Sequence, residues 1–441
     1  MKKIACHTLG CKVNQYDTQA MRELFENAGY ASVTFHEEAD IYLINTCTVT
    51  GTGDTKSLKL IRRIHRVHPN ADIIVSGCLA QRDAARVSLP GVRLVLGVKQ
   101  RAQIVELYER AIYADGVLSA VDEAESWSFE RLAVSKHDDK TRAVMKIQEG
   151  CDRYCAYCII PSVRGPLRYM PLDDVKREAA HLAAQGYCEI VLTGIHLASY
   201  GRGIEGDGDA QPDAHPTLVD AIRAVHDTDG VLRVRLGSLE PPLISDAFVS
   251  ALSTLPNVCP QFHLSMQSGS AGVLKRMRRR YSPDDYFAAV ERLRAAYPSC
   301  AITTDVLTGF PGETDEEAEE TLAFVKQVNF ARIHVFPYSR RAGTVADELP
   351  GQVPETIKSM RAATLIDLGN KLETEFVKGT IGRVIPVLME VRQQGGLCAG
   401  YSPEYVRIIA QGEPGQISMV AVTSTEGHTA FGSLGKDVEP R

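Results

Sequence analysis

Apolar, strand-like runs alternate with amphipathic helical stretches along the first 114 residues. The expected strands cover residues 3–9, 40–45, 72–76 and 93–96, and the expected helices cover residues 14–28, 55–68, 80–87 and 103–114. Parallel strands need a long crossover, usually a helix, to return to the same end of the sheet. The alternation therefore predicts an α/β fold that begins with an open parallel α/β sheet over residues 1–114, followed by a charged, irregular linker over residues 115–140.

Six further apolar runs recur between residues 141 and 375, with helical stretches between most of them. These runs cover residues 143–148, 189–193, 232–236, 261–265, 301–307 and 332–336. Six strand–helix units predict a partial (β/α)6 barrel over residues 141–375. After a long helix, short strands punctuated by glycine and proline predict a small all-β module over residues 376–441.

The composition agrees with a globular protein of about three domains. The chain has 441 residues, of which 44% are hydrophobic and 24% are charged. Because the formal net charge is −6, a surface that binds nucleic acid would have to be a local basic patch. No apolar run approaches the ~18 residues of a membrane span, and Lys2 and Lys3 precede a short strand instead of a signal-peptide core. We therefore expect a cytoplasmic protein without a membrane partner.

Cys151, Cys155 and Cys158 form a CxxxCxxC pattern at the end of the first barrel strand. Three thiolates can bind three irons of a [4Fe-4S] cluster and leave the fourth iron without a protein ligand. The amino and carboxylate groups of S-adenosylmethionine could chelate that iron, and one electron would then yield a 5'-deoxyadenosyl radical. A structural zinc site is the alternative, but such sites close with four ligands. The pattern favours a radical-forming cluster.

A second set of cysteines is dispersed along the N-terminal domain. Cys11, Cys47 and Cys78 each follow an expected strand of the parallel sheet. The carboxyl ends of parallel strands share one edge, where ligands bind, so the three thiols should converge. A single free cysteine is more often a small buried hydrophobe. The equivalent position of all three nevertheless favours a second metal cluster.

The segments that carry these cysteines resemble those of a known enzyme family. Residues 151–158 look like the radical S-adenosylmethionine signature, and the segments TLGCKVNQ, NTCTVT and GCLAQ at residues 8–15, 45–50 and 77–81 resemble the N-terminal motifs of methylthiotransferases. The resemblance spans nearly the whole chain and includes a C-terminal part that is similar to the RNA-binding TRAM module. It implies a radical-SAM barrel at the centre and a TRAM-like module at the end.

Within the family, the motif GCKVNQ resembles the branch that modifies N6-threonylcarbamoyladenosine at position 37 of tRNA. The isopentenyladenosine enzymes usually have GCQMN there, and the ribosomal-protein enzymes have GCPKN. The resemblance implies that Cys11, Cys47 and Cys78 hold an auxiliary [4Fe-4S] cluster whose open iron carries the sulfur or methylthio group. It also implies two molecules of S-adenosylmethionine, one as methyl donor and one as radical source.

The implied product carries a methylthio group at C2 of the adenine. The C2–H bond is too inert for ordinary acid or base catalysis, so no side chain is expected to act as a catalytic acid or base. The implied partners are tRNA, bound through its anticodon loop, an electron donor and a sulfur source.

Residues at the ends of the barrel strands are candidates for binding S-adenosylmethionine. Tyr157 resembles the aromatic residue that packs near its adenine. In the wider superfamily, the turn after the second strand often carries the segment Gly-Gly-Glu. The glutamate of that segment is absent here, and a backbone carbonyl could take the place of its carboxylate. Each candidate could instead cap a loop. The candidates are Tyr157, Thr193, Gly194, Ser238, Glu240 and Gln267.

Two groups of basic residues are candidates for binding the RNA substrate. Arg164 and Arg168 lie just after the cysteine loop. A basic run further along the chain has a charge density that suits phosphate contact, although basic residues also favour the last turn of a solvated helix. That run contains Lys275, Arg276, Arg278, Arg279 and Arg280.

Two alternatives remain open at this point. One keeps the radical chemistry but changes the substrate to isopentenyladenosine of tRNA or to a ribosomal-protein aspartate. The other is a non-catalytic iron-sulfur protein that binds RNA. The CxxxCxxC spacing argues against a ferredoxin-type electron carrier, because ferredoxins usually bind a cluster with four local cysteines.

Overall fold

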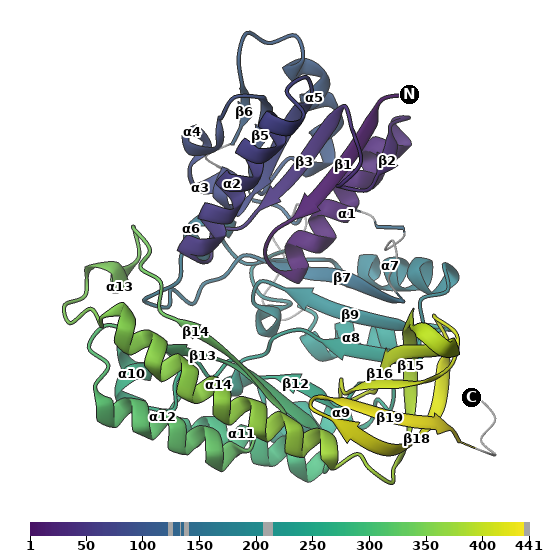
Figure 1. The fold of residues 1–441 in the computed structure, drawn as a ribbon, viewed down its shortest axis with the longest axis vertical. Coiled ribbons are helices and arrows are strands. Elements are labelled where there is room, and N and C mark those ends of the chain that lie inside the picture. Colours follow the sequence, from purple (N-terminus) through teal and green to yellow (C-terminus); the bar gives the residue numbers. More distant parts are fainter. Residues whose placement is uncertain (122–126, 133, 136–140, 206–214, 436–441) are drawn as a thin grey trace.

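The computed structural model describes residues 1–441 except 122–126, 133, 136–140, 206–214 and 436–441. An N-terminal α/β domain lies above the central barrel strands, and the C-terminal strands form a small barrel beside them (Figure 1). The predicted fold class is confirmed. In the parts of the chain that the structure describes, no helix is both long enough and apolar enough to cross a bilayer.

The N-terminal domain contains one six-stranded sheet in the order β2-β1-β3-β4-β5-β6. Every pair of neighbouring strands in it is parallel. The strands are β1 (Lys3–Thr8), β2 (Ala31–Val33), β3 (Ile41–Thr46), β4 (Asp72–Gly77), β5 (Val92–Leu96) and β6 (Leu118–Ala120). The helices are α1 (Lys12–Asn27), α2 (Gly51–Val67), α3 (Cys78–Arg82), α4 (Ala84–Val87) and α5 (Ile104–Ala111).

Alternation along β3 shows how this sheet is buried on both faces. Tyr42 and Ile44 pack in one core with residues of α2, whereas Ile41 and Leu43 pack in the other with residues of α1 and α5. Successive strand side chains point to opposite faces, so a strand covered on both sides is apolar throughout. This pattern makes the sheet a rigid support for the loops at its carboxyl edge.

One boundary in the sequence prediction needs correction. Residues 115–140 were expected to be a linker, but β6 lies within that range and pairs with β5 as the edge strand of the sheet. A three-residue strand carries too few alternating positions to be recognised from its sequence. The N-terminal sheet therefore extends to residue 120.

The central domain contains six parallel strands that form an incomplete barrel. They are β7 (Arg142–Glu149), β9 (Glu189–Gly194), β11 (Arg233–Leu236), β12 (Gln261–His263), β13 (Ala301–Thr308) and β14 (Arg332–Pro337). The strands fall into two sheets, and backbone hydrogen bonds of 2.8 Å from Val234 to Asn257 and from Cys259 to Val234 join them. The predicted order of six strand–helix units is confirmed.

Helices cover the outside of this barrel. They are α7 (Leu172–Ala184), α8 (Leu218–His226), α9 (Asp246–Ser253), α10 (Ala271–Arg276), α11 (Pro283–Ala296), α12 (Asp315–Val328) and α14 (Glu355–Lys378). Two short helices, α6 (Ile160–Arg164) and α13 (Val345–Glu348), instead lie in the loops after β7 and β14, and α6 packs against α3 of the N-terminal domain. Two short strands, β8 (Arg168–Tyr169) and β10 (Ile204–Glu205), extend the sheet beyond β7. The long helix α14 runs along β14 and leads into the C-terminal module (Figure 1).

The C-terminal module is a closed five-stranded barrel. Its strands are β15 (Val384–Arg392), β16 (Leu397–Tyr401), β17 (Arg407–Gln411), β18 (Ile417–Glu426) and β19 (Thr429–Leu434). Two buried arginines of β11 hold it against the central domain. Arg233 donates to the carbonyl of Pro386 at 2.7 Å, and Arg235 donates to that of Pro403 at 2.9 Å. The module is therefore docked by hydrogen bonds to its backbone.

Candidate active site between the two cysteine triads

The three dispersed cysteines lie at the carboxyl edge of the N-terminal sheet. Cys11 follows β1 and precedes α1, Cys47 follows β3, and Cys78 begins α3 directly after β4. The strand order reverses between β1 and β3, the position where open α/β sheets bind ligands. Burial, and then the nearby thiols of Cys11 and Cys47, raise the pKa of Cys78 to about 11 against the opposing charge of Arg164. The three thiols are thus close enough to interact.

Close packing joins the first two of these loops. Gly10 has φ +108°, and a methyl group in place of its hydrogen would lie 3.0 Å from Cys47 Cβ. Asn14 donates from Nδ2 to the carbonyls of Leu9 at 2.8 Å and Thr46 at 3.0 Å. The motif residues around the cysteines therefore position the two loops, a structural role that the sequence analysis did not assign.

Arg341, from the loop after β14, fixes the loop of Cys47 against the central domain. Its guanidinium lies 2.8 Å from Asp54 Oδ2 and donates to the carbonyls of Thr48 and Thr50. Only 5% of the Arg341 side chain is exposed. No local sequence pattern marks Arg341 as a site residue, because its partner Asp54 lies 287 positions earlier in the chain.

The local cysteine triad lies at the carboxyl end of β7. Cys151 and Cys155 are buried, and Cys158 is half-buried. Burial raises the pKa of Cys151 to about 11 and that of Cys158 to about 12. Arg279 donates from Nη1 to Cys155 Sγ at 3.1 Å. A positive group at this distance stabilises a thiolate, which is the form that binds a metal.

Glu240 organises the polar groups beside this triad. Its carboxylate lies 2.8 Å from His196 Nε2, 3.0 Å from Arg153 Nε and 3.0 Å from Arg279 Nη2. Burial opposes its ionisation, but the hydrogen bond from His196 and the charge of Arg279 hold the pKa of Glu240 at about 2. Glu240 therefore aligns Arg279 on Cys155, and His196 and Arg153 are site residues that the sequence analysis missed.

The other cofactor candidates occupy different environments around the barrel mouth. Tyr157 lies between Cys155 and Cys158 and packs edge-on against Phe310, with ring centroids 6.5 Å apart. Gln267 adopts the left-handed conformation, with φ 69°, and pairs with the backbone of β13. Both residues lie in loops that follow barrel strands, Tyr157 after β7 and Gln267 after β12.

The turn after β9 is closely packed. A methyl group on Gly194 would lie 2.8 Å from Gln148 Cβ, and Gln148 Oε1 accepts a hydrogen bond of 2.7 Å from the backbone of His196. Thr193 is buried, whereas Ser238 is exposed and lines a cavity of the barrel. Gln148 thus occupies space beside the turn where the wider superfamily often supplies an acid.

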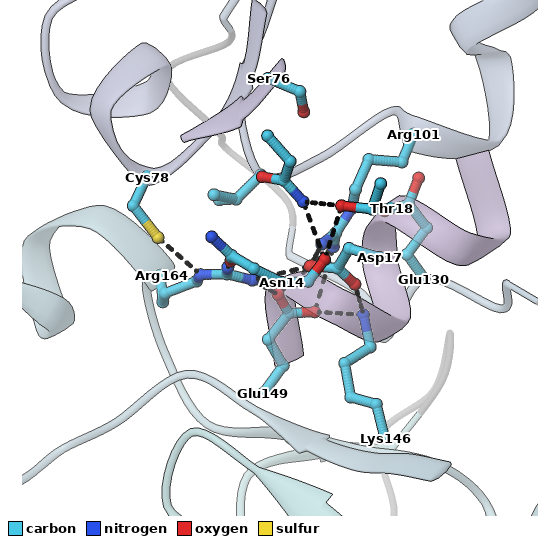
Figure 2. Close-up of polar contacts among 12 residues, drawn as sticks. Asn14, Asp17, Thr18, Ser76, Cys78, Arg101, Glu130, Lys146, Glu149 and Arg164 are labelled. Atoms are coloured by element: carbon cyan, nitrogen blue, oxygen red, sulfur yellow. Dashed lines mark hydrogen bonds and ion pairs between the residues drawn. The ribbon is translucent and has the colours of Figure 1, made fainter. Parts of the chain in front are cut away.

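The expectation that Arg164 and Arg168 contact RNA is corrected by the structure. Their side chains are 0% and 1% exposed, which leaves no guanidinium for a phosphate. Arg164 donates from Nε to Cys78 Sγ at 3.2 Å and from Nη1 to Glu149 at 2.6 Å (Figure 2). Arg168 instead donates to the carbonyl of Arg164 at 2.9 Å.

Arg164 belongs to a buried charge cluster at the interface of the N-terminal and central domains. Asp17 accepts from Lys146 at 2.6 Å and from Arg164 at 3.2 Å (Figure 2). Four cations in this cluster face three carboxylates. The cations are Arg101, Lys146, Arg164 and Arg168, and the carboxylates are Asp17, Glu130 and Glu149. An excess of buried positive charge beside Cys78 suits an anionic group there.

Only part of the basic run is available to RNA. Arg279 is 6% exposed and bonds Cys155, and Arg276 forms a two-pronged ion pair with Glu317. For Arg279 the expectation of an RNA contact is therefore corrected. Lys275, Arg278 and Arg280 are exposed at the end of α10 and in the turn that follows.

The surroundings of the two cysteine triads bear on which metal group they could hold. Among the described residues, no group of three or more His, Cys, Asp or Glu side chains is arranged to hold one metal ion. Each cysteine of a [4Fe-4S] cluster binds a different iron, so its ligands do not converge on one point. Each triad also has an arginine directed at one of its sulfurs, Cys78 in one and Cys155 in the other. These donors suit a negatively charged cluster with three thiolates.

Two family models match the chain. Residues 3–97 match the uncharacterized protein family UPF0004, and residues 145–325 match the radical SAM superfamily. The first match covers the dispersed cysteines and the second covers the local triad.

Relatives of known function align along nearly the whole chain. The threonylcarbamoyladenosine tRNA methylthiotransferase MtaB of Bacillus subtilis is 38% identical, and the alignment covers 95% of this chain and 93% of the relative. MtaB of Thermotoga maritima is 36% identical, with 92% and 91% covered. The tRNA-2-methylthio-N(6)-dimethylallyladenosine synthase of Acidothermus cellulolyticus is 35% identical, with 96% and 86% covered.

Solved structures support the same fold. The radical S-adenosylmethionine methyltransferase TsrM from Kitasatospora setae, with cobalamin and a [4Fe-4S] cluster bound, has a TM-score of 0.55 at 14% identity, and the match covers 90% of this chain and 80% of that chain. At this identity the similarity concerns the fold alone. The identities of more than 30% to relatives that align along nearly the whole chain show that the chain belongs to the radical S-adenosylmethionine methylthiotransferase family.

Proposed function

We propose that the protein inserts a methylthio group at C2 of N6-threonylcarbamoyladenosine 37 of tRNA. The observation that carries this proposal is the pair of cysteine triads, one at the carboxyl edge of each of two adjoining sheets. The names of the MtaB relatives support the threonylcarbamoyl substrate. The related dimethylallyladenosine synthases support the same chemistry on tRNA.

Each triad would hold one [4Fe-4S] cluster. Cys151, Cys155 and Cys158 would leave one iron for S-adenosylmethionine, and the dispersed triad would leave one iron for the sulfur that is transferred. The bound clusters and S-adenosylmethionine supply the radical and the sulfur chemistry. The side chains of the protein hold, orient and shield these groups.

The arginines beside the cysteines have complementary positioning roles in this scheme. Arg279, aligned by Glu240, would stabilise the negative charge at Cys155. Arg164, aligned by Glu149, would do the same at Cys78. Hydrogen bonds to cluster sulfurs are among the main influences on cluster potential. In this scheme no side chain acts as a general acid or a general base.

The target nucleotide must reach the space between the triads. A nucleotide in an anticodon loop can leave its stack at low cost because it is not held in a duplex. The exposed Lys275, Arg278 and Arg280 would contact the phosphates near it. We further infer that the reaction takes place in the cytoplasm and depends on an electron donor and a sulfur source.

Nucleoside analysis of tRNA from a strain without the protein tests the substrate. We expect 2-methylthio-N6-threonylcarbamoyladenosine to disappear and N6-threonylcarbamoyladenosine to accumulate. Loss of the methylthio derivative of isopentenyladenosine instead would show that the substrate assignment is wrong.

A second measurement separates an enzyme from a non-catalytic RNA-binding protein. Anaerobically reconstituted protein should form 5'-deoxyadenosine when a reductant and S-adenosylmethionine are added. The Cys155→Ala variant should form none, because its radical cluster would lack a ligand. The absence of 5'-deoxyadenosine from the wild-type reaction would favour the non-catalytic alternative.

A further inference from the structure

A polar cavity of about 300 Å³ lies between the N-terminal domain, the inner face of the barrel and the C-terminal module. The N-terminal domain contributes Lys12 and the barrel strands contribute His263, Asp305 and His334. Arg407 of β17 lines it from the C-terminal module. Cavities that bind small groups are usually more apolar than this, so a polar occupant is expected.

Strand register explains why this wall of the cavity is polar. Asp305 of β13 lies opposite His334 of β14, and His263 of β12 lies opposite Thr303. Alternate strand residues face the same side, so these four side chains share the inner face, while Ile302 packs in the outer core. The hydrogen-bonding groups are therefore held on rigid strands.

Most of the charges around the cavity already have partners. Arg332 donates from Nε to Glu373 at 2.8 Å, and Arg235 donates from Nε to Glu189 at 2.7 Å. By contrast, no hydrogen bond or ion pair engages Lys12 among the residues that the structure describes, and its side chain is exposed. An unpaired ammonium group that lines a cavity is available to an anion that enters it.

The position of Lys12 connects this charge with the reaction. Lys12 is the first residue of α1 and directly follows Cys11. A group held by Lys12 would therefore lie beside the dispersed cysteine triad. The threonylcarbamoyl group carries a carboxylate, a hydroxyl and a urea unit, all on the N6 atom of the same adenine whose C2 must approach that triad.

We propose that this cavity binds the threonylcarbamoyl group of the target adenosine and that Lys12 pairs with the carboxylate of that group. This inference rests on the proposed function. His263, Asp305 and His334 provide donors and acceptors for the hydroxyl and urea groups. An isopentenyl group has no polar atom, so in this cavity it would leave these side chains without partners. Lys12 is thus a specificity-determining residue.

Two synthetic anticodon stem-loops test this assignment. One carries N6-threonylcarbamoyladenosine, and the other carries its carboxamide, in which the carboxylate is replaced by a neutral amide. With reconstituted enzyme, we expect kcat/KM for methylthiolation to be roughly 10- to 100-fold higher for the carboxylate RNA, as for a hydrogen bond to a charged group. The Kd measured by fluorescence anisotropy without S-adenosylmethionine should show the same preference.

The Lys12→Met variant should remove this preference by weakening the reaction and binding of the carboxylate RNA alone. Lys2→Met is the matched control, because Lys2 precedes β1 and so lies at the opposite edge of the same sheet. Iron content and formation of 5'-deoxyadenosine without RNA would show that the Lys12→Met variant retains both clusters. An equal loss on both RNAs, or no loss on either, would overturn the role of Lys12.

The wild-type enzyme alone also tests the cavity if the variant fails to hold its clusters. Equal kcat/KM for the two RNAs would contradict recognition of the carboxylate while leaving the proposed function intact. A wild-type enzyme that methylthiolates isopentenyladenosine RNA and neither of these RNAs would contradict the proposed function itself.

Discussion

Arg164 shows how one buried side chain can connect two domains. It comes from the helix after the local cysteine triad, yet it bonds Cys78 and Asp17 of the N-terminal domain and Glu149 of the barrel. A buried charge is tolerated only when its partners are complete, and removing one partner leaves the others uncompensated. The stability of this interface should therefore depend strongly on the guanidinium.

Replacing Arg164 with methionine should destabilise the protein by about 3 kcal/mol or more, because Asp17 and Glu149 would lose a buried cation. Thermal unfolding of cluster-free protein, followed by circular dichroism, measures the change. Arg292→Met is the matched control, since Arg292 is 41% exposed and its partner Asp246 is 90% exposed. Equal effects of the two substitutions would contradict a special role for the buried cluster.

Glu178 introduces a pH dependence at the same domain interface. The Tyr16 hydroxyl has one proton, which it donates to the carbonyl of Leu132, and it lies 3.0 Å from Glu178 Oε1. Burial raises the pKa of Glu178 to about 8. A protonated Glu178 can therefore donate to Tyr16, so its contribution to stability is complete below about pH 4.5 and is lost as the pH rises towards 8.

The Glu178→Gln variant should lose less stability than the wild type between pH 5 and pH 8.5, because a neutral amide can donate to Tyr16 at every pH. Melting temperatures across this range measure the difference, which should grow with pH in favour of the variant. Glu291→Gln, whose side chain is 57% exposed, controls for the loss of a carboxylate. A constant difference between Glu178→Gln and wild type would contradict the raised pKa.

At the scale of helices and strands, hydrophobic periodicity predicted most of the architecture. The strands β1, β3 and β4 were expected from apolar runs, and their parallel arrangement predicted that the three dispersed cysteines would meet at one edge. The short strands β2, β6, β8 and β10 were missed because two or three residues carry little periodic signal. Local patterns thus identify long elements but not the short strands at sheet edges.

Side-chain partners between distant elements could not be predicted in the same way. Arg164 was expected to contact RNA because it lies just after the cysteine loop, and Arg279 because it belongs to a dense basic run. Their burial depends on acids supplied by other elements, such as Asp17, which is 147 positions from Arg164 in the sequence. The sequence alone gives no indication of such pairing.

The loop between β3 and α2 should depend on Arg341 for its rigidity. Arg341→Ala would remove hydrogen bonds from a charged group to Thr48, Thr50 and Asp54, so amide hydrogen exchange in residues 48–54 should accelerate by about tenfold or more. Mass spectrometry of peptides from this segment measures the rate. Arg340→Ala is the control, because its 57% exposed side chain bonds Asp347 of α13. Unchanged exchange in Arg341→Ala would show that the loop is held by other contacts.

At the scale of the whole molecule, the two triads should load with iron separately. Two [4Fe-4S] clusters contain about eight irons, so Cys47→Ala and Cys155→Ala should each retain about four, and the double variant almost none. Iron analysis after anaerobic reconstitution measures these values. Cys300→Ala should retain all of the iron, since Cys300 packs in the barrel core. Full iron content in Cys47→Ala would contradict the auxiliary site.

The two triads also differ in how far apart their members lie along the chain, and this difference affects biogenesis. Cys151, Cys155 and Cys158 share one short loop, whereas Cys11, Cys47 and Cys78 are joined only after β1, β3 and β4 have paired. In the proposed scheme, the first set could receive iron before the tertiary structure is complete. The second set would become a binding site only when the N-terminal domain has folded, so cluster insertion there would indicate that this domain has folded correctly.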